Sequence, residues 1–357
     1  MNKFNIFGIS SGDAFSEALT LEDPDYLVAA PGIPLQRKLK DALSDWRFED
    51  LYSEGTILSQ DKSIHEKIAY NQFLDWTLGI LNDLAEDKDP DYDLIAEKIQ
   101  NLVQNLKEDP SKILLACEED LNENESAIQN LAVHSTISCI LSILIGIQFK
   151  LSDERLEELG IAGLLHEAGM LKLPTEVYYS NLSLSPVNRK HLLAHPVLGY
   201  KLLKSFKFPE AVCAPALEHH ERENGQGYPR GVGSNKINLY SKIVAVACSY
   251  EAFNSKKPYK DEVRQATRGI LEILRNEGKA YDDRIVRALV QALSIYPIGS
   301  FVMLSNGSPA QVIRSIPNEP KFPQVAVIKN GKQSDEIITR ADGIYIIGAI
   351  SRQEAMA

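Results

Sequence analysis

The run His-His-Glu-Arg-Glu-Asn-Gly-Gln-Gly-Tyr-Pro at positions 219 to 229 is the most informative stretch of this sequence. Of the seven histidines in the chain, all but one lie between residues 131 and 260. A single histidine on an apolar helix is usually a hydrogen-bonded core residue, whereas histidine is also the commonest metal ligand. So many histidines in one helical region favour a shared metal site. The five that form the pattern are His134, His166, His195, His219 and His220.

Two adjacent pairs of side chains are expected at helix ends. His166-Glu167 precedes an Ala-Gly step, and His219-His220 precedes the glycine-rich loop. Neighbouring side chains diverge where a helix ends, so each pair can reach two neighbouring ions. Two-metal sites suit phosphodiester cleavage, because the ions bind the attacking and the leaving oxygen and lower the pKa of bound water.

Composition is that of an ordinary globular protein. The chain has 357 residues, 44% of them hydrophobic and 24% charged, which predicts two or three domains. A net charge of -11 argues against DNA, RNA duplexes or an anionic membrane as partners. The most apolar run, Ile140 to Ile147, is shorter than the roughly 20 residues of a spanning helix. The N-terminus lacks the apolar core of a signal peptide, and the four dispersed cysteines are typical of a reducing cytoplasm.

Apolar periodicity predicts a mainly α fold in four parts. These are a small α/β module at 1–60, connecting helices at 61–110, a helical domain at 111–296 and a β-rich extension at 297–357. In the first part we expect strands at 4–7 and 26–29 and a helix at 34–48. In the helical domain, Ala127 to Phe149 should be a central helix carrying His134, and Ser185-Pro186 should open a helix carrying His195. Strands are expected at 301–304, 310–313, 324–328 and 343–347.

Three segments resemble the HD-GYP family. Members of this family are HD-superfamily phosphohydrolases associated with cyclic di-GMP. They are Leu164 to Gly169, Ala194 to Gly199 and His219 to Pro229, and the last is highly specific. The resemblance covers about 126–261 and implies an HD-type helical bundle. It also implies a metal-dependent phosphodiesterase with two divalent ions (Fe, Mn or Zn), acting on cyclic di-GMP by attack of metal hydroxide on the phosphodiester.

Carried over by position, the resemblance implies a set of six metal ligands. Glu167 would take the bridging and catalytic role of the family's aspartate, with a side chain one methylene longer. Asn130 replaces the acidic ligand of three-metal members, so a third ion is not expected. The six are His134, His166, Glu167, His195, His219 and His220.

Other family positions are changed. Cys248 stands where the family has a further aspartate ligand, and it could be a thiolate ligand or a small buried residue. Met170 replaces the lysine that serves the phosphate, and Lys172 could substitute only if the loop path differs. Lys257 replaces an arginine that reaches the ligand; it keeps the charge and loses bidentate geometry.

The glycine-rich loop has three interpretations. Gly227, Tyr228 and Pro229, with Arg222, could line a nucleotide site. Tyr228 and Pro229 could instead form a docking face for another signalling protein, such as a diguanylate cyclase. The third interpretation is a turn that merely packs beside the metals. A homodimer would be compatible with the long helices.

Two functions follow from these residues. The first is an active cyclic di-GMP phosphodiesterase. The alternative is a weak or inactive HD-GYP-like sensor or interaction module that binds a cyclic dinucleotide or a partner protein. The intact histidines favour the first, and the changes at Glu167, Met170 and Cys248 favour the second.

Overall fold

A computed structural model describes residues 62–110, 126–174, 185–254, 267–296, 298–316, 319–329, 332–340, 343–350 and 352–356, with residue 177 and parts of 1–61. Lys257 and the expected helix start at Ser111 lie outside the described residues, as does much of the helix expected at 34–48. The chain divides into two compact units, Met1–Gln72 and Phe73–Ala357.

The first unit contains short antiparallel strands. One sheet has the order β1-β5-β3-β4, and β2 pairs with β6 in a second. Their bounds are β1 Asn2–Asn5, β2 Ala14–Phe15, β3 Leu19–Thr20, β4 Leu27–Ala29, β5 Asp50–Ser53 and β6 Ile57–Leu58. A small apolar core that includes Ile6, Phe15 and Leu51 lies within this unit. The strands expected near 4–7 and 26–29 are therefore present, with shifted bounds.

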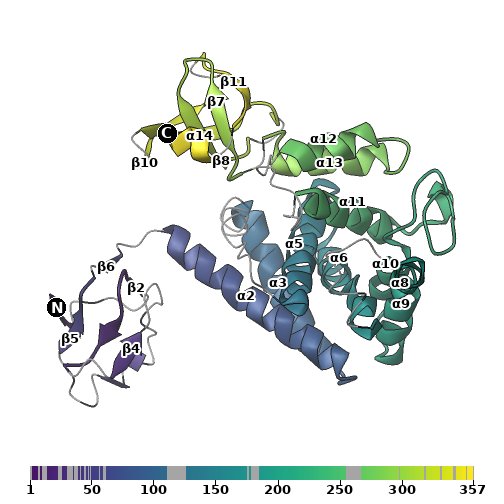
Figure 1. Cartoon of the computed structure of the whole chain (residues 1–357), viewed down its shortest axis with the longest axis horizontal. Helices are drawn as coiled ribbons and strands as arrows, with labels where there is room; N and C mark the ends of the chain where they lie inside the picture. The colour runs from purple at the N-terminus through teal and green to yellow at the C-terminus, as the bar shows by residue number, and fades with distance from the viewer. Residues whose placement is uncertain are drawn as a thin grey trace. The chain divides into compact units, whose positions relative to one another are not determined.

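Helices form most of the second unit (Figure 1). The connecting helices are α2 Lys62–Ala85 and α3 Tyr92–Glu108. The remaining helices are α5 Ala127–Gln148, α6 Asp153–Leu165, η2 Ala168–Lys172, α8 Pro186–Leu192, α9 His195–Ser205, α10 Glu210–Glu218, η3 Ser234–Lys236, α11 Leu239–Asn254, α12 Thr267–Arg275 and α13 Asp283–Leu293.

Helix α5 is the centre of this unit. Ser126 and Gln129 form a capping box at its start, in which each side chain bonds the other residue's backbone N–H. Fourteen of its residues between Leu131 and Gly146 are buried, and α3, α6, α11 and α13 contact it. Its length and hydropathy would fit a membrane span, but 78% of the apolar window is buried inside the structure. The prediction of a central helix carrying His134 is confirmed.

The segment around His195 differs from the prediction. One helix from Ser185-Pro186 to His195 was expected, but α8 ends at Leu192 and α9 begins at His195. Pro196 explains the break, because a proline lacks the N–H for an internal helical bond and is tolerated in a first turn. His195 therefore lies at a helix start rather than within a helix.

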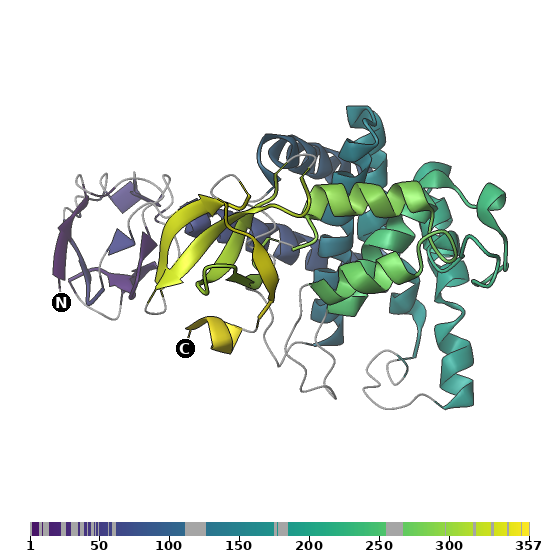
Figure 2. The same ribbon diagram turned by 90° about the horizontal axis from the view of Figure 1, so that it is seen from above.

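The chain ends in a five-stranded antiparallel sheet (Figure 2). Its order is β10-β9-β8-β7-β11. The bounds are β7 Phe301–Leu304, β8 Pro309–Arg314, β9 Gln324–Lys329, β10 Lys332–Ile338 and β11 Ile346–Ala349, followed by helix α14 Arg352–Met356. The edge strand β10 was not expected, because Lys-Gln-Ser-Asp-Glu opens it with polar residues.

Candidate metal centre

The five histidines and Glu167 converge from four segments of the second unit. His134 lies within α5, His166 is the C-cap of α6 and Glu167 follows it, while His195 begins α9. His219 is the C-cap of α10, with His220 next. Two groups result. The first ligand group is His134, His166 and Glu167; the second is Glu167, His195, His219 and His220.

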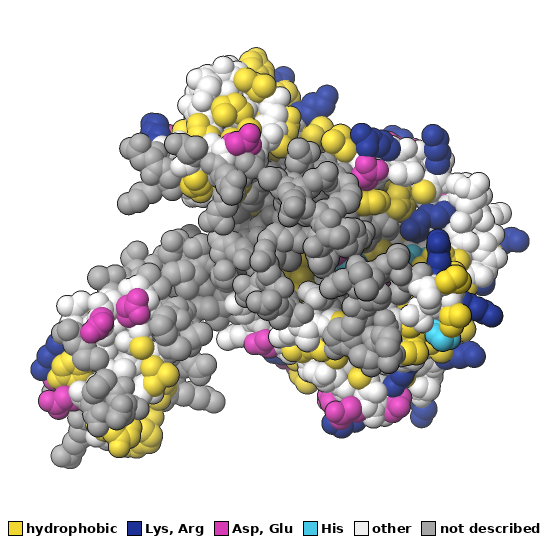
Figure 3. All heavy atoms as spheres, in the orientation of Figure 1, with side chains coloured by type: hydrophobic (Ala, Val, Ile, Leu, Met, Phe, Trp, Pro, Cys, Tyr) yellow, Lys and Arg dark blue, Asp and Glu magenta, His cyan; other side chains and the backbone are white. Residues whose placement is uncertain are grey.

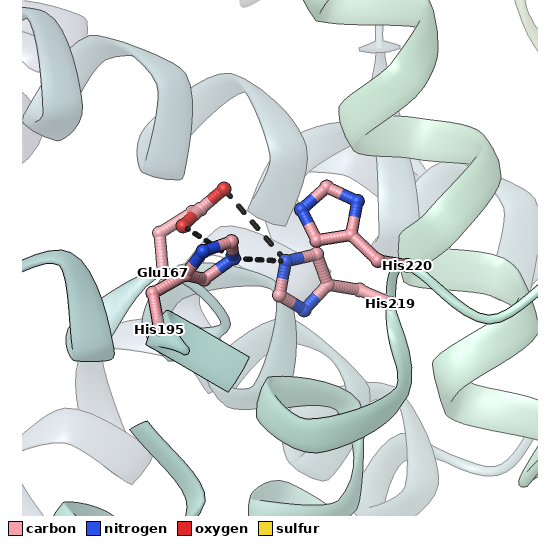
Figure 4. A group of neighbouring side chains, drawn as sticks. All are labelled: Glu167, His195, His219 and His220. Atoms are coloured by element: carbon pink, nitrogen blue, oxygen red, sulfur yellow. Dashed lines mark hydrogen bonds and ion pairs between the residues drawn. The ribbon is translucent and has the colours of Figure 1, made fainter. Parts of the chain in front are cut away.

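Glu167 belongs to both groups, so one carboxylate lies between two sets of imidazoles. Within each group, the ligand atoms all lie within 4.8 Å of one another. Figure 4 shows the second group, with the carboxylate of Glu167 turned toward the rings of His195 and His219. The structure brings the two predicted pairs, His166-Glu167 and His219-His220, together here, while their binding of two ions stays a prediction.

Backbone carbonyls fix the orientation of three rings. Nδ1 of His166 lies 2.8 Å from Gly163 O, Nδ1 of His195 lies 2.6 Å from Leu192 O, and Nδ1 of His219 lies 2.9 Å from Pro215 O. A carbonyl only accepts hydrogen bonds, so each Nδ1 must carry the hydrogen. Each Nε2 of a neutral ring is then left with a bare lone pair that faces the centre.

The lone pairs face one another at short range. Nε2 of His195 lies 3.2 Å from Nε2 of His219, and Nε2 of His134 lies 3.2 Å from Nε2 of His166. Two bare nitrogens repel unless a positive charge lies beside them. Two imidazole nitrogens bound tetrahedrally to one zinc ion, at roughly 2.0–2.1 Å each, are about 3.3 Å apart. The spacing therefore fits a shared cation.

The carboxylate of Glu167 provides an independent test of that fit. Oε2 lies 3.4 Å from Nε2 of His195, and Oε1 lies 3.7 Å from Nε2 of His219. Among the described residues, the buried Oε2 has no hydrogen-bond partner. An unpaired buried carboxylate oxygen is costly, and a bound cation would remove that cost. Nitrogen and carboxylate donors together suit Zn, Mn and Fe.

The ionisation states also suit metal binding. Burial, with repulsion from His219, lowers the pKa of His166 well below its usual value, and burial likewise lowers that of His195. Burial lowers the pKa of His220 strongly as well. Burial would raise the pKa of Glu167, but His195 and His219 outweigh it and the pKa is lowered. Neutral imidazoles with an ionised carboxylate are the forms that bind metals.

His134 differs from the other rings in what holds it. Its Nδ1 contacts the carboxylate of Glu251 on α11, and the Glu251 side chain is 7% exposed. Burial lowers the pKa of His134, but attraction to Glu251 outweighs it and the pKa is raised. A carboxylate bonded to the outer nitrogen of a histidine is common at metal sites. Glu251 was not among the predicted site residues.

The two halves of the centre meet through backbone contact at Gly169. A Cβ atom at that position would lie 2.5 Å from Gly199 N and closer still to His195 O. The turn η2 therefore approaches the start of α9 more closely than any side chain permits. This contact brings Glu167, two residues earlier, against His195.

The glycine-rich loop folds back onto the second histidine pair. The Tyr228 ring stacks on His220 with centroids 4.5 Å apart and planes 17° apart, and Tyr228 N donates to His220 O at 3.2 Å. A Cβ at Gly227 would lie 2.5 Å from Glu221 Cα and 2.6 Å from Arg222 N, so only glycine fits. Pro229 continues the loop through a cis peptide bond.

Two buried carboxylates that were not predicted hold this loop. Glu221 accepts hydrogen bonds from Arg230 N at 2.7 Å and Val232 N at 3.0 Å. Glu218 accepts from Asn238 N at 2.9 Å and Ser241 Oγ at 2.7 Å, and it pairs with the Arg230 guanidinium. Both side chains are buried, although acidic residues usually lie at the surface. The loop is thus fixed relative to the histidines.

Two other predicted site residues, Arg222 and Lys172, contact backbone carbonyls and neighbouring side chains. The Arg222 guanidinium donates to His219 O and Glu221 O at 2.9 Å each and lies over the Tyr281 ring. Lys172 donates to Ala85 O at 3.1 Å and pairs with Asp87 at 2.7 Å, at the end of α2. Their predicted ligand-binding and catalytic roles stay predictions, as does that of Lys257.

Cys248 is buried on α11 outside both ligand groups. Its thiol donates to Ala245 O at 3.5 Å, and burial raises its pKa to about 12. The thiol is therefore protonated at neutral pH, whereas metal binding needs the thiolate. Of the two interpretations of this position, a small buried side chain agrees better with these surroundings.

Comparison with known proteins defines the family. A family model described as HD domain matches residues 92–285, more than half of the chain. The chain therefore belongs to the HD domain family. Within that family, its motifs and its relatives identify it as an HD-GYP member.

Several curated relatives share this region. The cyclic di-GMP phosphodiesterase PdeB of Borreliella burgdorferi is 28% identical over 205 residues, covering 57% of this chain and 54% of PdeB. The cyclic di-GMP phosphodiesterase PA4108 of Pseudomonas aeruginosa is 32% identical over 196 residues, covering 55% and 47%. The chain thus spans about half the length of these relatives.

A solved structure supports the fold. A HDG"Y"P protein from Bdellovibrio bacteriovorus superposes with a TM-score of 0.51 at 15% identity, covering 81% of this chain and 97% of that protein. At that identity the likeness establishes the fold alone. The expected mainly α, HD-type bundle with C-terminal strands is confirmed. The N-terminal module, expected to be α/β, contains a small sheet, and much of its expected helix lies outside the described residues.

Proposed function

We propose that this protein is a metal-dependent phosphodiesterase that hydrolyses cyclic di-GMP. The observation that carries the proposal is the sharing of Glu167 between two groups of metal-ligand atoms, beside the loop that carries Tyr228. Relatives named cyclic di-GMP phosphodiesterases over the same region support the substrate class. Other relatives are named 3'3'-cGAMP-specific phosphodiesterases, so a related cyclic dinucleotide is the nearest alternative substrate.

Each group of residues has a distinct task in this proposal. His134 and His166 would hold one divalent ion, and His195, His219 and His220 a second, with Glu167 between them. Divalent ions held there lower the pKa of water and offset the negative charge of the phosphodiester. The backbone bonds to Nδ1 of His166, His195 and His219 keep each Nε2 directed at the centre, so little reorganisation is needed on binding.

The face seen in Figure 3 carries many lysine and arginine side chains over the helical domain, although the whole chain has a net charge of -11. Positive charge on that face would attract an anionic substrate to the domain. The Tyr228 ring, stacked on His220 at the edge of the second group, would limit where a base or phosphate can lie.

The second candidate is a weak or inactive member that binds a cyclic dinucleotide or a signalling protein, such as a diguanylate cyclase. Two positions favour it. Met170 packs in an apolar cluster where the resemblance calls for a phosphate-binding lysine, and Cys248 is a buried neutral thiol where it calls for an aspartate. With either function, we also propose the four-part domain organisation, a homodimer and a cytoplasmic location.

The two candidates separate in one assay. Purified protein, supplied in turn with Mn, Fe and Zn, is incubated with cyclic di-GMP or 3'3'-cGAMP, and linear dinucleotide or mononucleotide is measured by chromatography. Turnover of cyclic di-GMP with at least one metal, abolished in His219→Ala, is the expected result. Measurable nucleotide binding without product for any metal would overturn the enzyme and leave the binding module. Absence of both would leave a structural role.

A further inference from the structure

The rings of the centre are held in two different ways. His166, His195 and His219 lie at helix boundaries, and each donates Nδ1–H to a carbonyl in the last turn of α6, α8 or α10. Carbonyls in the last turn of a helix have spare acceptor capacity, and Pro215 O accepts from both the backbone N–H and the ring of His219. His134 lies inside α5, where neighbouring carbonyls are already engaged in helical bonds. Its ring needs a partner from another element.

Glu251 of α11 supplies that partner. Its carboxylate contacts Nδ1 of His134 across 117 positions of sequence. The Glu251 side chain is 7% exposed and that of His134 is 20% exposed, so water screens this pair weakly. An ionised carboxylate only accepts hydrogen bonds, so the hydrogen must lie on Nδ1. Nε2 of His134 is then the bare nitrogen, and it faces Nε2 of His166 at 3.2 Å.

We propose that Glu251 is a positioning residue for the first ligand group, which fixes the tautomer of His134 and makes its Nε2 a stronger donor. The inference rests on the proposed function for the identity of the group as a metal site. Two effects can be separated. The hydrogen bond fixes the ring, and the negative charge draws the Nδ1 hydrogen and enriches Nε2 in electron density.

The consequence is an asymmetry between the two ligand groups. In the second group, backbone carbonyls, which no substitution removes, orient His195 and His219, whereas in the first group the ring of His134 depends on one side chain of α11. Loss of an outer carboxylate partner at a metal site lowers metal affinity by about 10–100-fold. Only the ion held by His134 and His166 should weaken by that factor when Glu251 is lost. The ion held by His195, His219 and His220 should be unchanged.

Glu251→Gln and Glu251→Ala separate the two effects. The glutamine oxygen can still accept a hydrogen bond from Nδ1, so Glu251→Gln should keep the tautomer of His134 and lose only the contribution of the charge. The metal affinity of the first group should therefore fall by much less than in Glu251→Ala. Alanine should lose both and show the full decrease. Asp282→Asn is the matched control, because Asp282 is buried to 8% exposure and its partners are Arg284 and Lys242.

Two measurements decide the proposal. Stepwise titration with Mn²⁺, monitored through the signal of the free ion, gives the affinity of each site. Nitrogen-15 spectra of histidine-labelled, metal-free protein give the tautomer of His134, assigned by comparison with His134→Ala. The expected result is one site weakened about 10–100-fold in Glu251→Ala, with a changed His134 tautomer and an unaltered Asp282→Asn control.

The opposite outcomes would overturn it. Two unchanged Mn²⁺ affinities in Glu251→Ala, or an unchanged His134 tautomer, would make Glu251 a passive neighbour. If wild-type protein binds two ions and turns over no cyclic dinucleotide, the proposed function fails while this inference stands. If wild-type protein binds no ion, the metal site fails, and the tautomer in metal-free protein still decides whether Glu251 fixes the ring.

Discussion

The two ligand groups share Glu167 and differ in how their other residues are held. The second group is built at helix ends, where backbone carbonyls orient His195 and His219 and a loop packs Tyr228 on His220. In the first group, His134 comes from the middle of α5 and is held by a side chain of α11. Local backbone carbonyls thus orient His166, His195 and His219, whereas a contact between distant helices orients His134. The second group should therefore tolerate substitution in α11, and the first should not.

The largest effect is expected from the residue that both groups share. Glu167→Ala should release both ions, because it removes a ligand from each group. Loss of a mere outer partner costs about 10–100-fold in affinity, so loss of this ligand should exceed 100-fold. Elemental analysis after gel filtration would measure the metal content. His219→Ala is the comparison, and it should release mainly the ion of the second group; equal losses in both variants would contradict a shared carboxylate.

The next effect concerns the backbone contact that joins the two groups. Gly169→Ala places a Cβ against Gly199 N and His195 O, and a contact that close must push η2 away from α9. We expect unfolding free energy to fall by about 3 kcal/mol, as in overpacked cores. Chemical denaturation of the metal-free protein measures it.

Gly79→Ala is its control, because a Cβ at Gly79 meets no atom within 4 Å. That substitution lies within helix α2 and should stabilise the protein by about 0.5–1 kcal/mol. Similar changes in both variants would show that the effect at Gly169 comes from backbone entropy and not from the close approach.

A smaller effect is expected at Cys248, three residues before Glu251 on α11. Cys248→Asp should raise activity or shift metal preference toward Mn, because a carboxylate suits harder ions than a thiol does. Rates with Mn, Fe and Zn supplied in turn would measure this. An unaltered profile would indicate that position 248 does not face the ions.

In the wild type, a pKa of about 12 keeps the thiol of Cys248 protonated at pH 8, so alkylation should be far slower than for a free cysteine.

The smallest effect is expected at Lys172, which lies at the end of η2. Its ion pair with Asp87 is largely exposed on the aspartate side, so Lys172→Ala should cost less than about 1 kcal/mol. Urea denaturation would measure the loss, and Asp87→Asn should reproduce it. If Lys172→Ala instead abolished turnover while Asp87→Asn did not, Lys172 would act on the substrate, as the family resemblance allows.

The sequence identified the residues that carry chemistry better than those that position them. The histidines could be found because they recur beside a distinctive loop in a helical region. Glu251, Glu218 and Glu221 could not be found in this way, because an acidic residue is expected at the surface unless its binding partner is known. Their partners are backbone groups or side chains that lie elsewhere in the sequence. The break before His195 had a local signal, since Pro196 marks a first helical turn. Strand β10 had none, because its polar residues hide the alternation of an edge strand.

Helix α2 continues across the boundary between the two compact units, and its later part leads to the centre. Leu78 and Leu81 share an apolar cluster with Met170 and Leu171 of η2, the turn that directly follows Glu167. The end of the same helix is tied to that turn through Lys172. A substitution that alters the packing of the later part of α2 would therefore shift η2, and with it the carboxylate that both ligand groups share.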